Sequence, residues 1–426
     1  MLASLPLEII EEILLNLDPL DVAHLSECCN LLRSLVYDTK DQALWRGLYL
    51  QQPLDDPRKC VSQEGVPNDE EINWKEALQR FVRARTVLYN TAFLPRDLTA
   101  LRVLLDLATH VPPLSSPEDV DNLSRNVAWV AATLGRVDDF HVLLDDEHPA
   151  SEEEIQLRAR VHTYYGLRGS DLRRTARVRS RAYVYDMRNY RADNHYGPLD
   201  SRGHVNWVHV QALHHVVSMH LVDLKEHEMF DFAIFPMSIF FIQPVISPGM
   251  DLDQEEDWAG VAGPWRVSFC FCDHRELLKY NESDVDENGN LDTSVFESPD
   301  FGEVFRSMNV MLRVIGTRPD PDHPKRPIID FAGAMLDNTS TMRGEVRMTP
   351  DNQVQWHFVS GDQDSAVWSS LGIQVGGVRA QFGVLGSWTT VFHESDDPVG
   401  PFWLRRQGEV TLGLPVHHVL LNASQQ

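Results

Sequence analysis

The sequence predicts an α+β protein, helical in its N-terminal and central parts and an antiparallel β-barrel or β-sandwich in its C-terminal part. Apolar residues recur at helical spacing up to about residue 229, and from Phe230 onward they alternate with polar residues. About six to nine alternating segments follow without long helices between them, which is typical of an antiparallel barrel or sandwich.

Composition limits the functions that are plausible. The chain has 426 residues, enough for two or three domains, and a formal net charge of -25. A chain this acidic is repelled by nucleic acid and by anionic membrane surfaces, so we expect neither as a partner.

Cysteine use and the N-terminus bear on the compartment. The five cysteines are an odd number without regular spacing, which suits a reducing compartment. The first 20 residues lack a basic signal region, and the longest uncharged apolar stretch, Phe232 to Met250, contains three prolines. We therefore expect a cytoplasmic or nuclear protein, or one found in both.

The first apolar segment reads LPLEIIEEILLNLDPLDVAHLSECCNLLRSLV, from Leu5 to Val36. Asp18 followed by Pro19 indicates a helix start, because Asp caps free amides and proline fits the first helical position. Ile9 and Ile13 share one helical stripe, and a second apolar stripe lies beside it. Helices this short bury little area together, so some of these side chains need another partner. That partner is either the rest of this chain or a separate protein.

These residues resemble the F-box. The resemblance runs from Leu5-Pro6 through Asp21-Val22 and Cys28-Cys29 to Leu44-Trp45-Arg46. It implies a three-helix unit, at residues 1–50, that docks onto the Skp-family adaptor of a Skp-cullin-F-box ubiquitin ligase. The resemblance implies these adaptor-binding residues: Leu5, Pro6, Ile9, Ile13, Leu14, Leu17, Leu20, Val22, Leu25 and Leu32.

The middle of the chain is predicted to be a spacer. Residues 51–70 are rich in Pro, Asp and Gly and are interpreted as a linker, and residues 71–229 as mainly helical. Ten arginines lie between Arg158 and Arg191, against the overall charge. They could pair with carboxylates of the chain, form a nuclear import signal, or form a docking patch for acidic sequence.

Residues 230–422 are the predicted β domain. In GPWRVSFCFCDH, Trp265 and Val267 alternate with Arg266 and Ser268, which predicts a strand with one buried side. MTPDN, between Arg347 and Gln353, predicts a hairpin turn. Five glycines would suit strands that bend to close a barrel. They are Gly372, Gly376, Gly377, Gly383 and Gly386.

The sequence of this domain carries two further resemblances. The segment that begins MRGEVRMTPDN, with GVLGSWTTVFHESDDPVGPFWLRR after it, resembles the C-terminal region of fungal F-box proteins. It is also weakly similar to the calycin-like barrel of the F-box receptor that captures D-type cyclins, which favours a barrel over a sandwich.

Three motifs resemble metal sites, but each lacks a required ligand. DVDENGNLD, from Asp284, starts like a calcium loop but has Val295 where a bidentate Glu is required. Cys270, Cys272 and His274 lack a fourth zinc ligand. A group of histidines, His214, His215 and His220, has no matching second ligand set. We predict no metal, no cofactor and no catalytic residue, because no phosphate-binding loop, nucleophile elbow or His-Glu-x-x-His helix occurs.

The predicted function is therefore that of a non-catalytic receptor that holds a protein substrate in an E3 ubiquitin ligase. The alternatives are a barrel that binds a small apolar ligand, and a scaffold that binds only the adaptor. Aromatic and arginine side chains dominate binding hot spots, although a core role is the alternative for each tryptophan. The candidate substrate-binding residues are Trp265, Arg266, Arg379, Trp388, Trp403 and Arg405.

Overall fold

The computed structural model describes residues 5–38, 41–89, 98–136, 151–221, 236–336, 339–362 and 365–407. Its contacts divide the chain into two compact units. Unit 1 comprises residues 1–61, 67–112 and 124–145, and unit 2 comprises residues 62–66, 113–123 and 146–426. This division differs from the predicted segments, because the spacer 71–229 is shared between the two units.

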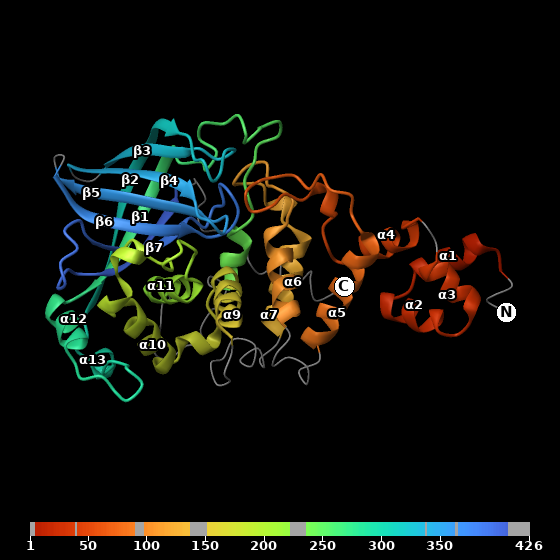
Figure 1. Ribbon diagram of the computed structural model, residues 1–426, viewed down its shortest axis with the longest axis horizontal. Helices are drawn as coiled ribbons and strands as arrows, with labels where there is room; N and C mark the ends of the chain where they lie inside the picture. The colour runs from red at the N-terminus through yellow and green to blue at the C-terminus, as the bar shows by residue number, and fades with distance from the viewer. Residues whose placement is uncertain are drawn as a thin grey trace. The chain divides into compact units, whose positions relative to one another are not determined.

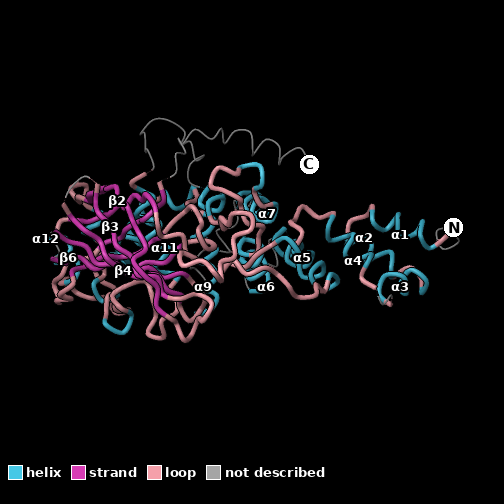
Figure 2. Tube along the Cα trace, turned by 90° about the horizontal axis from the view of Figure 1, so that it is seen from above, coloured by secondary structure: helices cyan, strands magenta, loops and turns pink. Residues whose placement is uncertain are grey.

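Unit 1 is built of helices, whereas the strands drawn in magenta in Figure 2 belong to unit 2. Its helices are α1 (Leu7–Leu15), α2 (Pro19–Ser26), α3 (Asn30–Tyr37), α4 (Ala43–Leu50), α5 (Trp74–Tyr89), α6 (Leu98–Thr109) and α7 (Arg125–Arg136). The predicted helix start at Asp18 is confirmed, since its carboxylate accepts a hydrogen bond from the Leu20 amide at 2.9 Å. Helices α5 and α6 each bury one face, as the spacing of their apolar residues predicts.

Unit 2 contains a closed antiparallel barrel in which strands β1 to β8 follow one another in sequence order. Figure 1 labels strands β1 to β7 of this barrel. The strands are β1 (Gly263–Cys272), β2 (Glu303–Arg318), β3 (Ile328–Met335), β4 (Ser340–Met348), β5 (Val354–Asp362), β6 (Ser365–Gln374), β7 (Val384–Thr390) and β8 (Gly400–Arg406). The barrel alternative is thus confirmed over the sandwich. The β4–β5 hairpin is also confirmed, with Asn352 in the left-handed conformation that its turn requires (φ 58°).

Large side chains fill the barrel interior. Trp265 and Trp356 meet edge to face at 5.2 Å between ring centroids, and Phe331 and Phe402 are fully buried beside them. Space for Phe402 comes from Gly372 and Gly386, which lie opposite each other in β6 and β7. A Cβ atom on Gly386 would lie 2.5 Å from the Phe402 ring, so the predicted role of these glycines in closure has a steric basis.

Five helices of unit 2 lie outside the barrel. They are α9 (Glu152–Tyr165), α10 (Arg174–Val184), α11 (Trp207–Met219), α12 (His274–Asn281) and α13 (Ser294–Glu297). Helix α11 contacts β7, β8 and β1. The prediction that β1 has one buried side is therefore wrong at its C-terminal end, where Cys270 and Cys272 on the outer face are buried too. A single strand cannot show that a distant helix will cover its second face.

The first strand begins later than the change in period predicts. Residues Pro236–Phe241 form a 3-10 helix, and the chain reaches β1 only after turns. Pro244 and Pro248 lie in this segment and have no amide hydrogen to donate to a sheet. Among the described helices, none has the length and apolar character needed to cross a membrane.

Candidate functional site

Helix α1 carries two apolar stripes that meet different surroundings. Ile10 and Leu14 are fully buried inside unit 1, whereas Ile9, the neighbour of Ile10, is 50 % exposed. Exposed apolar side chains on one small helical unit are typical of a binding surface. The exposed large apolar residues of this region are Leu5, Leu7, Ile9, Leu20 and Leu31. We call these five residues the apolar flank.

The structure divides the predicted adaptor-binding residues by burial. Leu5, Pro6, Ile9 and Leu20 are exposed. Three others, Ile13, Leu17 and Leu25, are half-buried. The last three, Leu14, Val22 and Leu32, are buried in the core of unit 1. These three support the packing of the helices and offer no surface to a partner. The prediction included them because the periodicity of short helices does not distinguish an inner stripe from an outer one.

Two residues of the apolar flank, Leu7 and Leu31, are not among the predicted adaptor-binding residues. Each is the first or second residue of its helix, where no preceding turn covers the side chain. Their position at a helix start was the signal that could have identified them.

The start of α2 is held in place by α5. Arg85 donates a hydrogen bond to Asp18 at 2.8 Å, and Asp18 caps α2. Burial by itself would raise the pKa of the Asp18 carboxyl, but the hydrogen bonds from Arg85 and from the Leu20 amide outweigh it and lower the pKa. This contact orients the helices that carry the apolar flank.

Three of the candidate substrate-binding residues lie together on the outer wall of the barrel. Arg266 of β1 is paired in register with Arg405 of β8, and the Arg405 guanidinium lies 4.7 Å from the ring centroid of Trp403. Burial, and then the charge of Arg266, lower the pKa of Arg405. No ion pair joins either arginine to a carboxylate among the described residues. We call Arg266, Trp403 and Arg405 the arginine patch.

The other three candidates lie elsewhere. Trp265 and Trp388 point into the barrel and are buried, with their indole N–H groups donating to Val261 and Cys270 carbonyls at 2.7 and 3.1 Å. They hold core positions, which was the stated alternative for each tryptophan. Arg379 packs at the end of the barrel and donates to the Asp257 carbonyl at 3.2 Å. It therefore does not join the arginine patch.

Five of the ten arginines in the arginine-rich segment 158–191 form ion pairs within unit 2. Ion pairs join Arg181 to Glu303 at 2.8 Å and Arg188 to Asp186 at 2.7 Å. Other ion pairs are Arg158–Glu154, Arg174–Glu297 and Arg191–Asp193. Internal pairing is thus confirmed for these five arginines.

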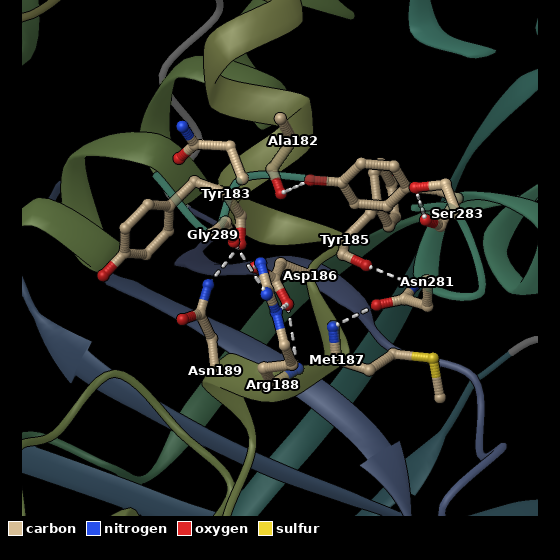
Figure 3. A network of polar contacts seen from close by, with 12 residues as sticks. Ala182, Tyr183, Tyr185, Asp186, Met187, Arg188, Asn189, Asn281, Ser283 and Gly289 are labelled. Atoms are coloured by element: carbon tan, nitrogen blue, oxygen red, sulfur yellow. Dashed lines mark hydrogen bonds and ion pairs between the residues drawn. The ribbon is translucent and has the colours of Figure 1, made fainter. Parts of the chain in front are cut away.

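Figure 3 shows how one of these arginines reaches the calcium-like loop. Arg188 binds Asp186 and also donates to the Gly289 carbonyl at 3.0 Å. In the same loop, Asp286 accepts hydrogen bonds from the amides of Asn288 and Asn290, both at 2.8 Å. The loop is thus ordered by protein hydrogen bonds, with a guanidinium beside it.

Three groups that the sequence singled out, His220, Cys270 and Cys272, lie near the buried carboxylate of Glu303. Glu303 is bound by Arg181, by His220 at 2.9 Å and by the Tyr185 hydroxyl at 2.6 Å. Burial by itself would raise the pKa of Glu303, but these partners outweigh it and lower the pKa. Burial, and then the charge of Glu303, raise the pKa of both the Cys270 and the Cys272 thiol. Such neutral thiols are poor nucleophiles and poor ligands.

The fold also gives the histidines of the group His214, His215 and His220 different surroundings. His215 hydrogen-bonds Ser180 at 2.5 Å and the Asp171 carbonyl at 2.9 Å, whereas His214 packs on the Phe382 ring. His274 contacts the Asp396 carbonyl at 2.8 Å. In the part of the chain that the structure describes, no group of three or more His, Cys, Asp or Glu side chains is arranged to hold a metal ion.

Comparison with known proteins agrees with the N-terminal geometry. The F-box domain family matches residues 2–41, the segment that carries all five residues of the apolar flank. No curated protein and no solved structure gave a match to the chain.

Proposed function

Because residues 2–41 form an F-box domain, we propose that this chain is the substrate-recognition subunit of a Skp-cullin-F-box ubiquitin ligase. F-box domains bind Skp-type adaptors, and F-box proteins are generally non-catalytic subunits. In this proposal the apolar flank binds the adaptor, and through it a cullin, while the barrel binds a protein substrate in the cytoplasm or the nucleus.

The observation that carries the proposal is the apolar flank. Its side chains are about 40 to 50 % exposed, although they belong to a small helical unit with a complete core of its own. Covering such side chains with a partner contributes binding free energy of about 25 cal/mol for each Å² removed from water. Flanking charges, among them Glu8 and Glu11, would form a polar rim.

The arginine patch is the candidate substrate contact. Like charges placed opposite each other on neighbouring strands oppose folding. Arg266 donates to the Asn309 side chain at 3.2 Å, but neither arginine has a carboxylate partner among the described residues, which suits the pair to an acidic partner. Trp403, half-buried beside Arg405, adds an aromatic surface of the kind found at binding hot spots. The subunit would then work by holding a target lysine close to the loaded conjugating enzyme.

A scaffold that binds only the adaptor is the second candidate. The apolar flank supports it equally, since the flank concerns the adaptor and not the cullin. A barrel for a small apolar ligand is less favoured, because the barrel interior around Trp265, Trp356 and Phe402 is packed.

Co-purification tests the proposal and separates it from the scaffold. The full chain is co-expressed with a Skp adaptor and a cullin. The complex is purified through the full chain and analysed by size-exclusion chromatography. We expect all three proteins to elute together, and Ile9→Asp to abolish the complex. Phe392→Asp, which changes an exposed apolar residue of unit 2, is the matched control and should leave the complex intact. Adaptor without cullin would indicate the scaffold, and no adaptor would overturn both.

A further inference from the structure

The two arginines of the arginine patch belong to a longer row of side chains across the barrel wall. Arg405 of β8 lies opposite Arg266 of β1, and Arg266 lies opposite Asn309 of β2. The row ends at Leu336, directly after β3, whose amide donates to the Asn309 carbonyl at 2.9 Å. These side chains face outward, because each is next in sequence to a buried core residue that faces inward. We call Arg405, Arg266, Asn309 and Leu336 the outer row.

One end of the outer row is positively charged. Among the described residues, neither Arg266 nor Arg405 forms an ion pair with a carboxylate. The Arg405 guanidinium lies over the Trp403 ring and donates no hydrogen bond to a described residue. A carboxylate placed between the two cations would relieve their repulsion and accept charge-assisted hydrogen bonds from both. This end of the row therefore suits an acidic side chain of a partner.

The other end of the outer row is apolar and open to solvent. Leu336 is 58 % exposed, and Met311, two positions beyond Asn309 on the same face of β2, is 44 % exposed. Ala334, the register partner of Met311, is exposed too. Neighbouring apolar side chains left in water gain free energy when a partner covers them. This end of the row therefore suits an apolar side chain.

Closure of the barrel decides how a partner can bind to this wall. Each of the eight strands is paired on both sides, so no strand edge offers its amides to an added strand. A partner segment must therefore be held through side chains that face the outer row. In an extended segment that crosses the strands, every second side chain faces the wall.

The width of the row sets the spacing of those side chains. Neighbouring strands are about 4.8 Å apart, so the point midway between Arg405 and Arg266 is about 12 Å from Leu336 across the strands. An extended chain advances about 3.3 Å per residue, so four residues cover about 13 Å. Side chains four positions apart also point to the same face. Both requirements are met when the acidic and the apolar residue are four positions apart.

We propose that the outer row binds an extended segment of a protein substrate in which an acidic residue and a large apolar residue are four positions apart. The acidic side chain lies between Arg266 and Arg405, and the apolar side chain covers Leu336 and Met311. This inference rests on the proposed function, and it names the class of sequence that the receptor recognises.

The test uses the full chain in complex with its Skp adaptor, and three peptides capped at both ends. The parent peptide, Leu-Thr-Asn-Thr-Glu-Thr-Asn-Thr-Leu, has a leucine four positions from the glutamate on either side, so it fits the row in both chain directions. The second peptide has glutamine in place of the glutamate. The third, Thr-Leu-Asn-Thr-Glu-Thr-Asn-Leu-Thr, has the composition of the parent but places its leucines three positions from the glutamate.

Isothermal titration calorimetry at physiological salt measures the three affinities. We expect the glutamine peptide to bind about tenfold more weakly than the parent, as for the loss of hydrogen bonds to a charged group. The third peptide should bind about threefold to tenfold more weakly, because its leucines face away from the wall when its glutamate faces the arginines.

Protein variants assign the contacts. With Arg266→Gln the difference between the parent and the glutamine peptide should shrink, because one of the two cations facing the glutamate is gone. With Leu336→Ser the difference between the parent and the third peptide should shrink, because the apolar contact is reduced. Arg313→Gln is the matched control and should leave all three affinities unchanged, since Arg313 is exposed on the outer face of β2 but lies outside the outer row.

Four results would overturn the proposal. The first is the absence of binding of the parent peptide at millimolar concentration. The second and third are equal affinities of the parent and the glutamine peptide, and equal affinities of the parent and the third peptide. The fourth is equal weakening of the parent peptide by Arg266→Gln and Arg313→Gln. In each case the complex with adaptor and cullin would still form through the apolar flank, so failure here is distinguishable from failure of the proposed function.

Discussion

Arg266 and Arg405 lie directly opposite each other on β1 and β8, and the described part of the structure places no carboxylate in an ion pair with either. Arg405 is also partly removed from water and stacks on Trp403. A chain with 63 acidic residues has ample means to neutralise such a pair. That the pair stays unneutralised is the main structural argument for an acidic partner at this wall of the barrel.

Arg266→Glu should stabilise the free protein. The change replaces a repulsive pair on neighbouring strands by an attractive one, and we expect the free energy of unfolding to rise by about 0.5 kcal/mol at low salt. The gain should shrink as salt is added. Urea unfolding at two ionic strengths measures it, with Arg313→Glu, whose register partner is Ala332, as control. A loss of stability in Arg266→Glu would contradict the repulsion.

Ile9 and Ile10 are adjacent in sequence but should respond differently to truncation. Ile9→Ala should weaken adaptor binding by at least tenfold with unchanged unfolding, because its side chain is exposed. Ile10→Ala should lower the free energy of unfolding by about 2 to 4 kcal/mol, because it leaves a cavity in the core. Thermal unfolding and calorimetric titration with the adaptor separate the two effects. Equal stability of the two variants would place Ile10 outside the core.

Gly386→Ala should destabilise unit 2 strongly. The new Cβ atom would lie 2.2 Å from the Leu371 carbonyl oxygen and 2.4 Å from the Gly372 Cα atom, both backbone atoms that cannot move independently of the barrel. We expect a loss of about 2 kcal/mol or more. Gly316→Ala is the control, because nothing lies within 4 Å of its added Cβ atom. Similar melting temperatures for both variants would contradict the close approach of β6 and β7.

Acidification should destabilise unit 2 through its buried histidines. Burial lowers the pKa of His209 to about 3, of His214 to about 3 and of His215 to about 4, from an ordinary value of 6.5. Below pH 6.5 the unfolded chain therefore binds protons that the folded chain does not, and stability falls as the pH falls toward 4. The slope for one such histidine is up to about 1.4 kcal/mol per pH unit.

Urea unfolding between pH 7.5 and pH 5 measures this slope. His209→Gln should make the slope shallower whatever its effect on absolute stability, since one titrating group is removed. His24→Gln changes an exposed histidine of unit 1 and should leave the slope unchanged. A slope that is the same in His209→Gln as in the parent chain would contradict the burial of that imidazole.

Local patterns were sufficient for several elements. The cap at Asp18, the hairpin turn at Asn352 and the inner face of β1 at Trp265 each depend on residues a few positions apart. Such interactions are readable from spacing alone. The F-box resemblance is likewise carried by a continuous segment, and the family match covers the same residues.

Burial at both faces, and the grouping of distant side chains, could not be predicted in this way. Cys270 reads as the polar side of a strand until α11, which precedes it in the chain, packs on that side. Arg266 and Arg405 are 139 positions apart and meet only because β8 closes the barrel against β1. Closure is a property of all eight strands together, so no single strand signals it.

The sequence by itself determined where most helices and strands lie, and it determined the F-box identity of the first 40 residues or so, because both follow from contacts between near neighbours in the chain. Only the tertiary structure decided which apolar residues stay at the surface, as Ile9 does and Ile10 does not, and which arginines have no carboxylate partner among the described residues. The reason is physical: burial and charge pairing depend on atoms brought together by folding, whatever their distance along the chain.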